Sequence, residues 1–261
     1  MCNLYNVGSK DELAIHLRAF GHELLLPDLP KATVGPFDTG WFLRPGPRGW
    51  MAQAGQWGLI RPGQPERIDR VQPKAQPGKK PPAPRPRSTN NARLEGIETK
   101  PTFKAAWRSG QRCLIPMAWY QEPNWETGKN LWWHLRHADG LPWMVAGLWS
   151  EWTDPTTGEL VPNFTALTVN CNDHPLLSRL HKPEVDPHTR QPLPWAEQDK
   201  RSLVHIEPAH WQAWAQGDIA AAKVLLVPAP LSSFDLAVTV ETDQCLAAMR
   251  LSSPASQQLL I

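Results

Sequence analysis

Four runs of apolar, β-branched and aromatic residues in the second half of the chain restrict its fold more than any other feature. They lie at 112–122, 131–136, 143–152 and 163–170, with residues typical of turns between them. Short strands spaced in this way are typical of a meander or a closed barrel. A similar run at 49–60 adds strands to the same sheet. We therefore predict a central, mainly antiparallel, barrel-like β-sheet.

Short helices are predicted around this sheet, which makes the fold class α+β. Ser9 and Glu12 have the spacing of a capping box, and Gly21 can end the helix that follows. Further helices are predicted at 102–109, at 175–180 with Asp173 as cap, and at 208–216. With 41% hydrophobic residues, the chain 1–261 is expected to form one domain.

Most of the 14 tryptophans are expected in the core. Those whose neighbours predict a buried face are Trp132, Trp143, Trp149, Trp211 and Trp214. Aromatic rings also stack on the bases of single-stranded nucleic acids. Trp57, beside a glycine and close to a basic segment, is the tryptophan predicted to contact a base.

That basic segment covers residues 61–87. It contains eight prolines, and eight Lys or Arg residues against two acids, so its net charge is +6 while the whole chain carries +2. Proline lacks the N–H group that sheets and helices require. We therefore expect a mobile surface insertion that pairs in no sheet and favours a polyanionic partner.

The sequence argues against several classes of protein. No apolar run approaches the ~20 residues that span a bilayer, and no secretion signal is recognisable, so a cytoplasmic protein without a membrane partner is expected. The four cysteines are widely spaced, which predicts neither a disulfide framework nor a zinc site. Cys113, Cys171 and Cys245 are expected to be buried as small apolar residues.

Cys2 is different because it becomes the first residue if Met1 is removed. It would then carry an α-amine with a pKa of about 8 and a thiol with a pKa of about 8.5. An amine condenses with an aldehyde to an imine, and a thiol two carbons away can close a five-membered thiazolidine ring. Cys2 is therefore the candidate nucleophile for an aldehyde.

Several separated segments resemble one family. They are MCNLY at 1–5, QWGLI at 56–60, NARLE at 91–95, and RCLIP at 112–116 with Glu122 six residues after the proline. His181, after FTALT at 164–168, stands where that family has the histidine of an H-x-R-M-P motif. In order and spacing these segments resemble the SRAP family, the SOS response-associated peptidases that process abasic sites. The likeness runs from residue 1 to about residue 240.

The resemblance implies a single domain with the SRAP fold and a covalent trap for abasic sites in single-stranded DNA, with strand scission as a side reaction. Cys2 would form the imine and then the thiazolidine. Glu122 would act as general acid and base; the structural alternative for it is an ion pair with Arg93 or Arg112. His181 would bond the 4′ hydroxyl oxygen of the sugar and move protons. Asn91 would hold the Cys2 amine or the sugar. A monomer without cofactor or metal is implied, associated with the nucleoid when bound to DNA.

Three basic residues are the candidates for contacts with the phosphates of such a strand. Arg93 is expected to bind a phosphate beside the lesion. Lys104 and Arg108, one turn apart on a predicted helix, either extend the phosphate track or form a solvated basic face. Leu4 stands where the family has an arginine, so one phosphate contact is expected to be absent or supplied by another residue. An insertion follows His181-Lys182-Pro183, and Lys200-Arg201-Ser202 can replace the end of the motif.

Two other functions fit the same residues. A cysteine at the mature N-terminus also serves amidohydrolases and peptidases, in which the thiol attacks a carbonyl and the amine acts as base. Removal of Met1 by the protein itself would be such a reaction. The second of these alternatives is a single-strand binder that shields lesions without covalent chemistry.

Overall fold

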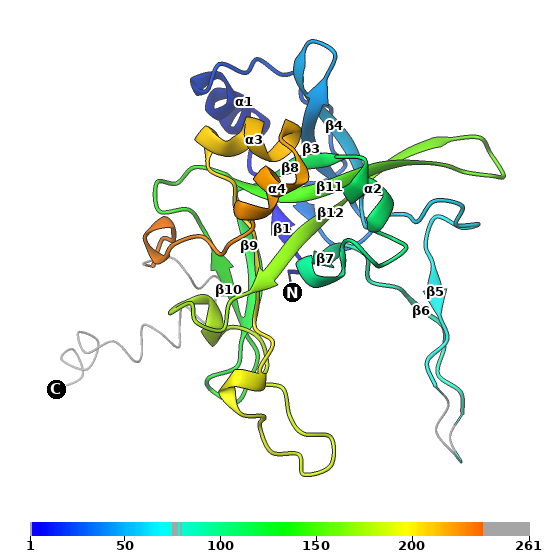
Figure 1. The fold of residues 1–261 in the computed structure, drawn as a ribbon, viewed down its shortest axis with the longest axis vertical. Coiled ribbons are helices and arrows are strands. Elements are labelled where there is room, and N and C mark those ends of the chain that lie inside the picture. The colour runs from blue at the N-terminus through cyan, green and yellow to red at the C-terminus, as the bar shows by residue number, and fades with distance from the viewer. Residues whose placement is uncertain (1, 75–77, 79, 237–261) are drawn as a thin grey trace.

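Five strands close into a barrel at the centre of the molecule (Figure 1). The computed structural model describes residues 2–74, 78 and 80–236. Around the barrel the order is β11 (Trp143–Thr153), β8 (Arg112–Met117), β3 (Thr39–Gly46), β4 (Gly49–Trp57) and β12 (Leu160–Asn170), which pairs back onto β11. All neighbours are antiparallel except β4 and β12. The predicted barrel-like, mainly antiparallel sheet is confirmed.

A second sheet carries the start of the chain. Its order is β10 (Leu131–Leu135), β9 (Trp119–Asn124), β1 (Tyr5–Asn6) and β2 (Thr33–Val34), and all its pairs are antiparallel. The run predicted at 112–122 therefore forms two strands that belong to different sheets, with Ala118 between them. At one edge of the barrel, β12 also pairs with β7 (Asn91–Arg93) and β13 (Arg201–Leu203).

The helices are short and surround the sheets. The α-helices are α1 (Lys10–Ala19), α2 (Lys104–Arg108), α3 (Trp211–Gln216) and α4 (Ile219–Val224). The 3-10 helices are η1 (Leu94–Gly96), η2 (Leu177–Arg179), η3 (Trp195–Glu197), η4 (Pro208–His210) and η5 (Leu231–Ser233). In the described part of the chain, none of them has the length and apolarity to cross a membrane.

The capping box of α1 is present as predicted, since Ser9 accepts a hydrogen bond from the Glu12 backbone and Glu12 accepts one from Ser9. The predicted cap at Asp173 is wrong. The ring of His174 accepts hydrogen bonds from the backbone N–H groups of Leu176 and Leu177 instead. Imidazole nitrogen is an acceptor in its neutral form, so a histidine can replace a carboxylate in this position.

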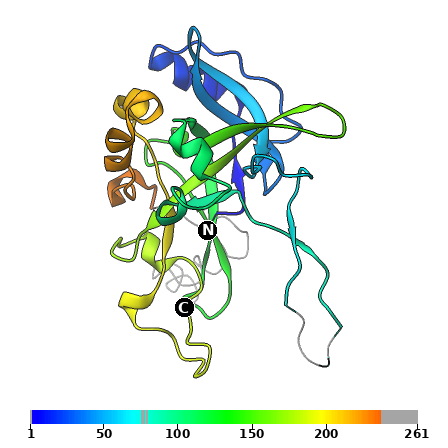
Figure 2. The same cartoon turned by 45° about the vertical axis from the view of Figure 1, so that its right-hand side comes forward.

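The basic segment contains a two-stranded ribbon, which corrects the prediction that it pairs in no sheet. β5 (Arg70–Val71) and β6 (Arg85–Pro86) are antiparallel, and Arg87 donates to Asp69 at 2.7 Å. Each strand of a two-stranded ribbon is an edge strand, where proline is tolerated. The ribbon extends away from the barrel in both views (Figures 1 and 2).

The core contains most of the tryptophans, and one of them corrects the sequence analysis. Trp57 is completely buried, with its ring edge-on to Tyr5 at 4.9 Å between centroids, so the prediction that it contacts a base is wrong. It ends β4 inside the barrel rather than at the surface. Of the tryptophans predicted as core, Trp143, Trp211 and Trp214 are buried, whereas Trp132 and Trp149 are half-buried.

The thiols of Cys113 and Cys171 are buried, as predicted for them, and Cys245 lies outside the described residues.

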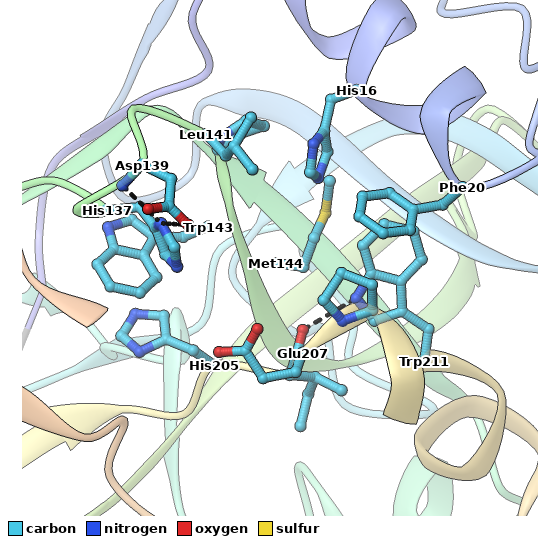
Figure 3. Close-up of a pocket in the computed structure, with 13 residues that line it drawn as sticks. His16, Phe20, His137, Asp139, Leu141, Trp143, Met144, His205, Glu207 and Trp211 are labelled. Atoms are coloured by element: carbon cyan, nitrogen blue, oxygen red, sulfur yellow. Dashed lines mark hydrogen bonds and ion pairs between the residues drawn. The ribbon is translucent and has the colours of Figure 1, made fainter. Parts of the chain in front are cut away.

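His205 is buried in an aromatic part of this core, two residues after the end of β13. Its ring stacks on Trp143 with 4.0 Å between centroids, and neither ring nitrogen has a hydrogen-bond partner among the described residues. Burial, and secondarily the nearby His137, lower the pKa of His205 to about 3. Figure 3 shows His205 beside Trp143 at the edge of a pocket of about 260 Å³ that also includes His16 and Glu207. None of the four predicted catalytic residues lines this pocket.

His205 predicts acid sensitivity of the fold. Below pH 6.5 an unfolded chain protonates this histidine, whereas the folded chain does not until about pH 3. Folding stability is therefore lost as the pH falls through this window, by about 4 kcal/mol between pH 7 and pH 3.5. His205→Phe keeps a planar ring without the titrating group, so its unfolding free energy should fall less steeply with acid. Urea unfolding from pH 7 to pH 4 measures this. The exposed His188, changed to Phe, is the control, and parallel curves for the wild type and His205→Phe would contradict the assignment.

Candidate active site

Cys2 lies in the interior of the protein, next to the first strand. Its exposed fraction is 0%, and its thiol donates to the Leu4 carbonyl at 3.3 Å. Burial, and after it the negative charge of Glu122, raise the pKa of the Cys2 thiol well above its usual range. The thiol is therefore neutral at pH 7 in this arrangement and requires a base to react.

Two amide side chains hold the backbone of Cys2. Asn91, at the start of β7, donates to the Cys2 carbonyl at 2.6 Å, and Asn90 donates to the same oxygen at 3.2 Å. Asn91 Oδ1 is buried and accepts no hydrogen bond from a described residue. The structure thus brings Asn91 to Cys2, although its contact is to the carbonyl. Asn90 was not predicted; its only signal was its place beside Asn91.

Glu122 and His181 meet next to this residue. Glu122 is 2% exposed on β9, and its Oε2 lies 3.6 Å from His181 Nδ1. Among the described contacts, the two arginines considered as partners of Glu122 bind other groups: Arg93 binds Asp199, and Arg112 donates to the carbonyls of Trp214 and Gly217. Sequence positions 59 residues apart therefore form one carboxylate–imidazole pair.

His181 is fixed by its backbone and by its second ring nitrogen. Its φ is 64°, in the left-handed region, and its N–H donates to the Pro123 carbonyl at 2.6 Å. Nε2 lies 2.8 Å from the Arg201 carbonyl, so this nitrogen carries the proton and Nδ1 faces Glu122. Burial lowers the pKa of His181, although the charge of Glu122 opposes that effect. The imidazole is therefore neutral at pH 7.

Lys200 stabilises the same turn from inside. It is 4% exposed, and its Nζ donates to the carbonyls of Leu180 and His181 at 2.8 and 2.7 Å. Burial lowers the pKa of Lys200. Its ammonium thus satisfies two carbonyls of a left-handed turn that would otherwise lack a donor.

An ion-pair network borders the site on the side of β7. Asp199 binds Arg93 Nη1 at 2.5 Å and Arg201 Nε at 2.7 Å. Arg201 also donates to both oxygens of Glu95, at 2.9 and 2.7 Å, and these hydrogen bonds lower the pKa of that carboxyl. Arg93, predicted to bind a phosphate, is therefore already paired on one side, while 40% of its side chain stays exposed.

A basic depression of about 380 Å³ lies beside Asn91. Its lining residues are Arg87, Ser88, Thr89, Asn91, Arg93, Lys100, Pro101, Thr102 and Phe103. Lys104 and Arg108 follow on the exposed side of α2. Arg108 donates to the Glu98 carbonyl at 3.4 Å. The contacts of Arg93, Lys104 and Arg108 with DNA stay predictions.

Two buried phenols next to the site were missed by sequence reasoning. Tyr5 and Tyr120 are opposite each other in the pairing of β1 with β9, and neither hydroxyl has a hydrogen-bond partner among the described residues. Burial raises the pKa of both, and the charge of Glu122 contributes for Tyr120. Strand alternation was the available signal, because Tyr120 lies two residues before Glu122 and on the same face.

In the described ranges, no three His, Cys, Asp or Glu side chains gather so that they could hold a metal ion. The site is thus described by protein groups alone: a thiol, two amides, a carboxylate and an imidazole. The fold and this site define an α+β barrel protein whose second residue is a buried cysteine.

The chain belongs to the SRAP family, because the family model described as SOS response associated peptidase matches residues 4–242. Among curated proteins, none matches the chain. Solved structures are similar over nearly the whole chain. A protein from Bordetella bronchiseptica is 28% identical with a TM-score of 0.69, covering 90% of this chain and 97% of its own.

Two further structures support the fold alone. A protein from Bacteroides thetaiotaomicron is 18% identical with a TM-score of 0.65, and 94% of each chain is covered. A phage-related protein from Bordetella bronchiseptica is 14% identical with a TM-score of 0.55, covering 90% of this chain and 92% of its own.

Lys200 gives a test of how the site is held. Lys200→Met should lower the unfolding free energy by about 2 kcal/mol, because two buried carbonyls lose their donor. Urea unfolding measures this, with Lys129→Met, at an exposed position in the β9–β10 loop, as the control. Equal stability of Lys200→Met and the wild type would show that the turn does not depend on the ammonium.

Proposed function

We propose that this protein forms a covalent thiazolidine crosslink with abasic sites in single-stranded DNA through Cys2, after Met1 is removed. Family membership supports a role within the SOS response-associated peptidases. The crosslink, the lyase side reaction and the DNA substrate go beyond that membership and rest on the chemistry of the site.

The observation that carries the proposal is the group of polar side chains around residue 2. A residue so close to the chain end would ordinarily fray. Here Asn90 and Asn91 fix its carbonyl, and the Glu122–His181 pair lies beside it. A buried N-terminal cysteine with an acid–base pair suits condensation with an aldehyde, because each step of that reaction moves a proton.

The proposed reaction has two bond-forming steps. The Cys2 amine adds to the open-chain aldehyde at C1′, and loss of water gives the imine. The Cys2 sulfur then bonds to the same carbon, and the thiol proton passes to the imine nitrogen, which closes the thiazolidine. Competing loss of a C2′ proton from the imine would break the strand by β-elimination.

Glu122 and His181 supply the proton movements. Glu122 protonates the departing water and accepts the thiol proton, which this buried thiol does not lose by itself at pH 7. His181, neutral with Nδ1 towards Glu122, passes protons between that carboxyl and the sugar oxygen. Asn91 Oδ1 accepts no hydrogen bond from a described residue, and it would accept one from the free amine of a trimmed chain.

Charge supports a nucleic-acid substrate over a neutral peptide. The basic depression beside Asn91 contains Arg87, Arg93 and Lys100, and the ribbon of the 61–87 segment joins it at Arg87. Phosphate contacts of this kind add affinity that depends on salt and little on sequence. We assign Arg93, Lys104 and Arg108 to this track.

Cys2 provides the direct test. Incubation of the protein with an abasic single strand should give an adduct that survives a denaturing gel, and Cys2→Ala should abolish it. Cys2→Ser keeps the amine, so it should give an adduct only when borohydride reduces the imine. Cys113→Ala, which removes a buried thiol elsewhere, is the control. A stable adduct with Cys2→Ala would exclude the assignment.

Intact mass spectrometry of the same samples reports whether Met1 has been lost. Incubation with peptide amides tests the amidohydrolase alternative, which requires cleavage of a peptide by the wild type. Affinity for the strand without an adduct would instead indicate a binder that only shields the lesion.

Glu122 has a separate kinetic test. Glu122→Gln should slow adduct formation by about 10²-fold or more, because an amide of the same shape cannot transfer the proton. Single-turnover gel assays measure the rate. Glu159→Gln changes an exposed carboxylate in the loop between β11 and β12, outside both depressions, and should leave the rate unchanged. Equal rates for Glu122→Gln and the wild type would refute the role in proton transfer.

A further inference from the structure

A second depression lies beside His181 and shares no lining residue with the basic depression near Asn91. Its volume is about 230 Å³, and it is lined by Trp125, Glu126, Ser178, Arg179, His181, Pro183, Trp195 and Lys200. His181 and Lys200 also belong to the candidate active site. A ligand in this depression would therefore touch the imidazole that faces Glu122.

Trp195 is the most unusual residue of this depression, because 54% of it is exposed. A tryptophan is large and mostly apolar, so an exposed one beside a depression indicates a contact surface. It lies on η3, in the insertion that follows His181 and returns at Asp199. This segment is drawn in yellow at the foot of Figure 1.

The insertion is fixed by its own hydrogen bonds. Gln198 is 6% exposed; it accepts from the Glu184 N–H at 2.8 Å and donates to the carbonyls of Glu184 and Leu193 at 3.1 and 2.9 Å. Val185 and Pro192 form a β-bridge across its base. The exposure of Trp195 is thus part of an ordered loop that presents it at the surface.

Cations accompany the aromatic rings. Lys182 is exposed, and its Nζ lies 5.1 Å from the centre of the Trp125 ring. Arg179 lies over Trp133 at 5.0 Å and forms two 2.8 Å hydrogen bonds to Glu126. Aromatic faces next to basic side chains are the combination that single-stranded nucleic acid binders use for bases and phosphates. A purely apolar peptide has no negative group that could pair with the exposed ammonium of Lys182.

We propose that Trp195, with Trp125, forms a stacking site for an unpaired nucleobase next to the abasic sugar. This inference rests on the proposed function, since the sugar and the base belong to one strand. Stacking of that base would hold the strand while the sugar lies at His181 and Cys2. It would tolerate any base, because every base has an aromatic face.

The experiment separates stacking from covalent chemistry. Binding is measured by fluorescence anisotropy with strands whose abasic sugar is reduced, so that no imine can form. One strand keeps all its bases, and others lack one additional base, at successive positions on either side of the reduced sugar. Trp195→Ala should weaken binding of the strand with all bases about tenfold, whereas Trp195→Phe should retain most of the affinity.

The strand series identifies the stacked base. Removing that one base should weaken binding to the wild type by the same factor and should leave binding to Trp195→Ala unchanged. Leu25→Ala, at a position that is 92% exposed after α1, is the control and should bind every strand as the wild type does. Thermal unfolding verifies that each variant is folded.

Two results would overturn the proposal. The first is unchanged affinity in Trp195→Ala, which includes the case in which no strand binds at all. The second is an equal loss on every strand, whichever base is removed. Failure of the crosslink in the wild type, with base-dependent binding intact, would refute the covalent function and leave the stacking site standing.

Discussion

The first strand, β1, pairs with a neighbouring strand on each of its two edges, and the rest of the structure depends on this pairing. β1 is only two residues long, yet it pairs with β2 and with β9, and two amide side chains fix the carbonyl of the preceding Cys2. The sulfur is consequently held in the interior rather than in a frayed end. Asn91, Glu122 and His181 can share the proposed role only because Cys2 is fixed between them. The proposed chemistry therefore follows from the way the chain start is paired.

Such a site is costly to build, because it buries several polar groups in one place. The structure meets that cost with specific partners. Lys200 donates to the two carbonyls of the left-handed turn, and the Arg201 carbonyl fixes the His181 ring. Three buried polar atoms close to Cys2, namely Asn91 Oδ1 and the hydroxyl oxygens of Tyr5 and Tyr120, have no hydrogen-bond partner among the described residues. Buried polar groups without a hydrogen-bond partner are destabilising, and they are typical of sites where a substrate can supply the missing hydrogen bond.

The surroundings of the site differ on its two sides. The basic depression and the ribbon offer charge beside Asn91, while the second depression offers aromatic rings beside His181. A single strand has a charged backbone and flat bases, so the two surfaces suit different parts of the same molecule. In this arrangement the phosphates would be bound by the arginines and lysines, and a base by Trp195, while the sugar lies between them.

Local signals in the sequence determined the elements and several residues of the site. The capping box set the start of α1, the alternating apolar runs set the barrel strands, and motif spacing singled out Cys2, Glu122 and His181. Two features were decided by contacts between residues that are distant in the sequence: the burial of Trp57 and the pairing of β5 with β6. The physical reason is range. Caps and strand alternation act within a few residues, whereas burial and the meeting of Glu122 with His181 depend on which distant strands become neighbours when the barrel closes.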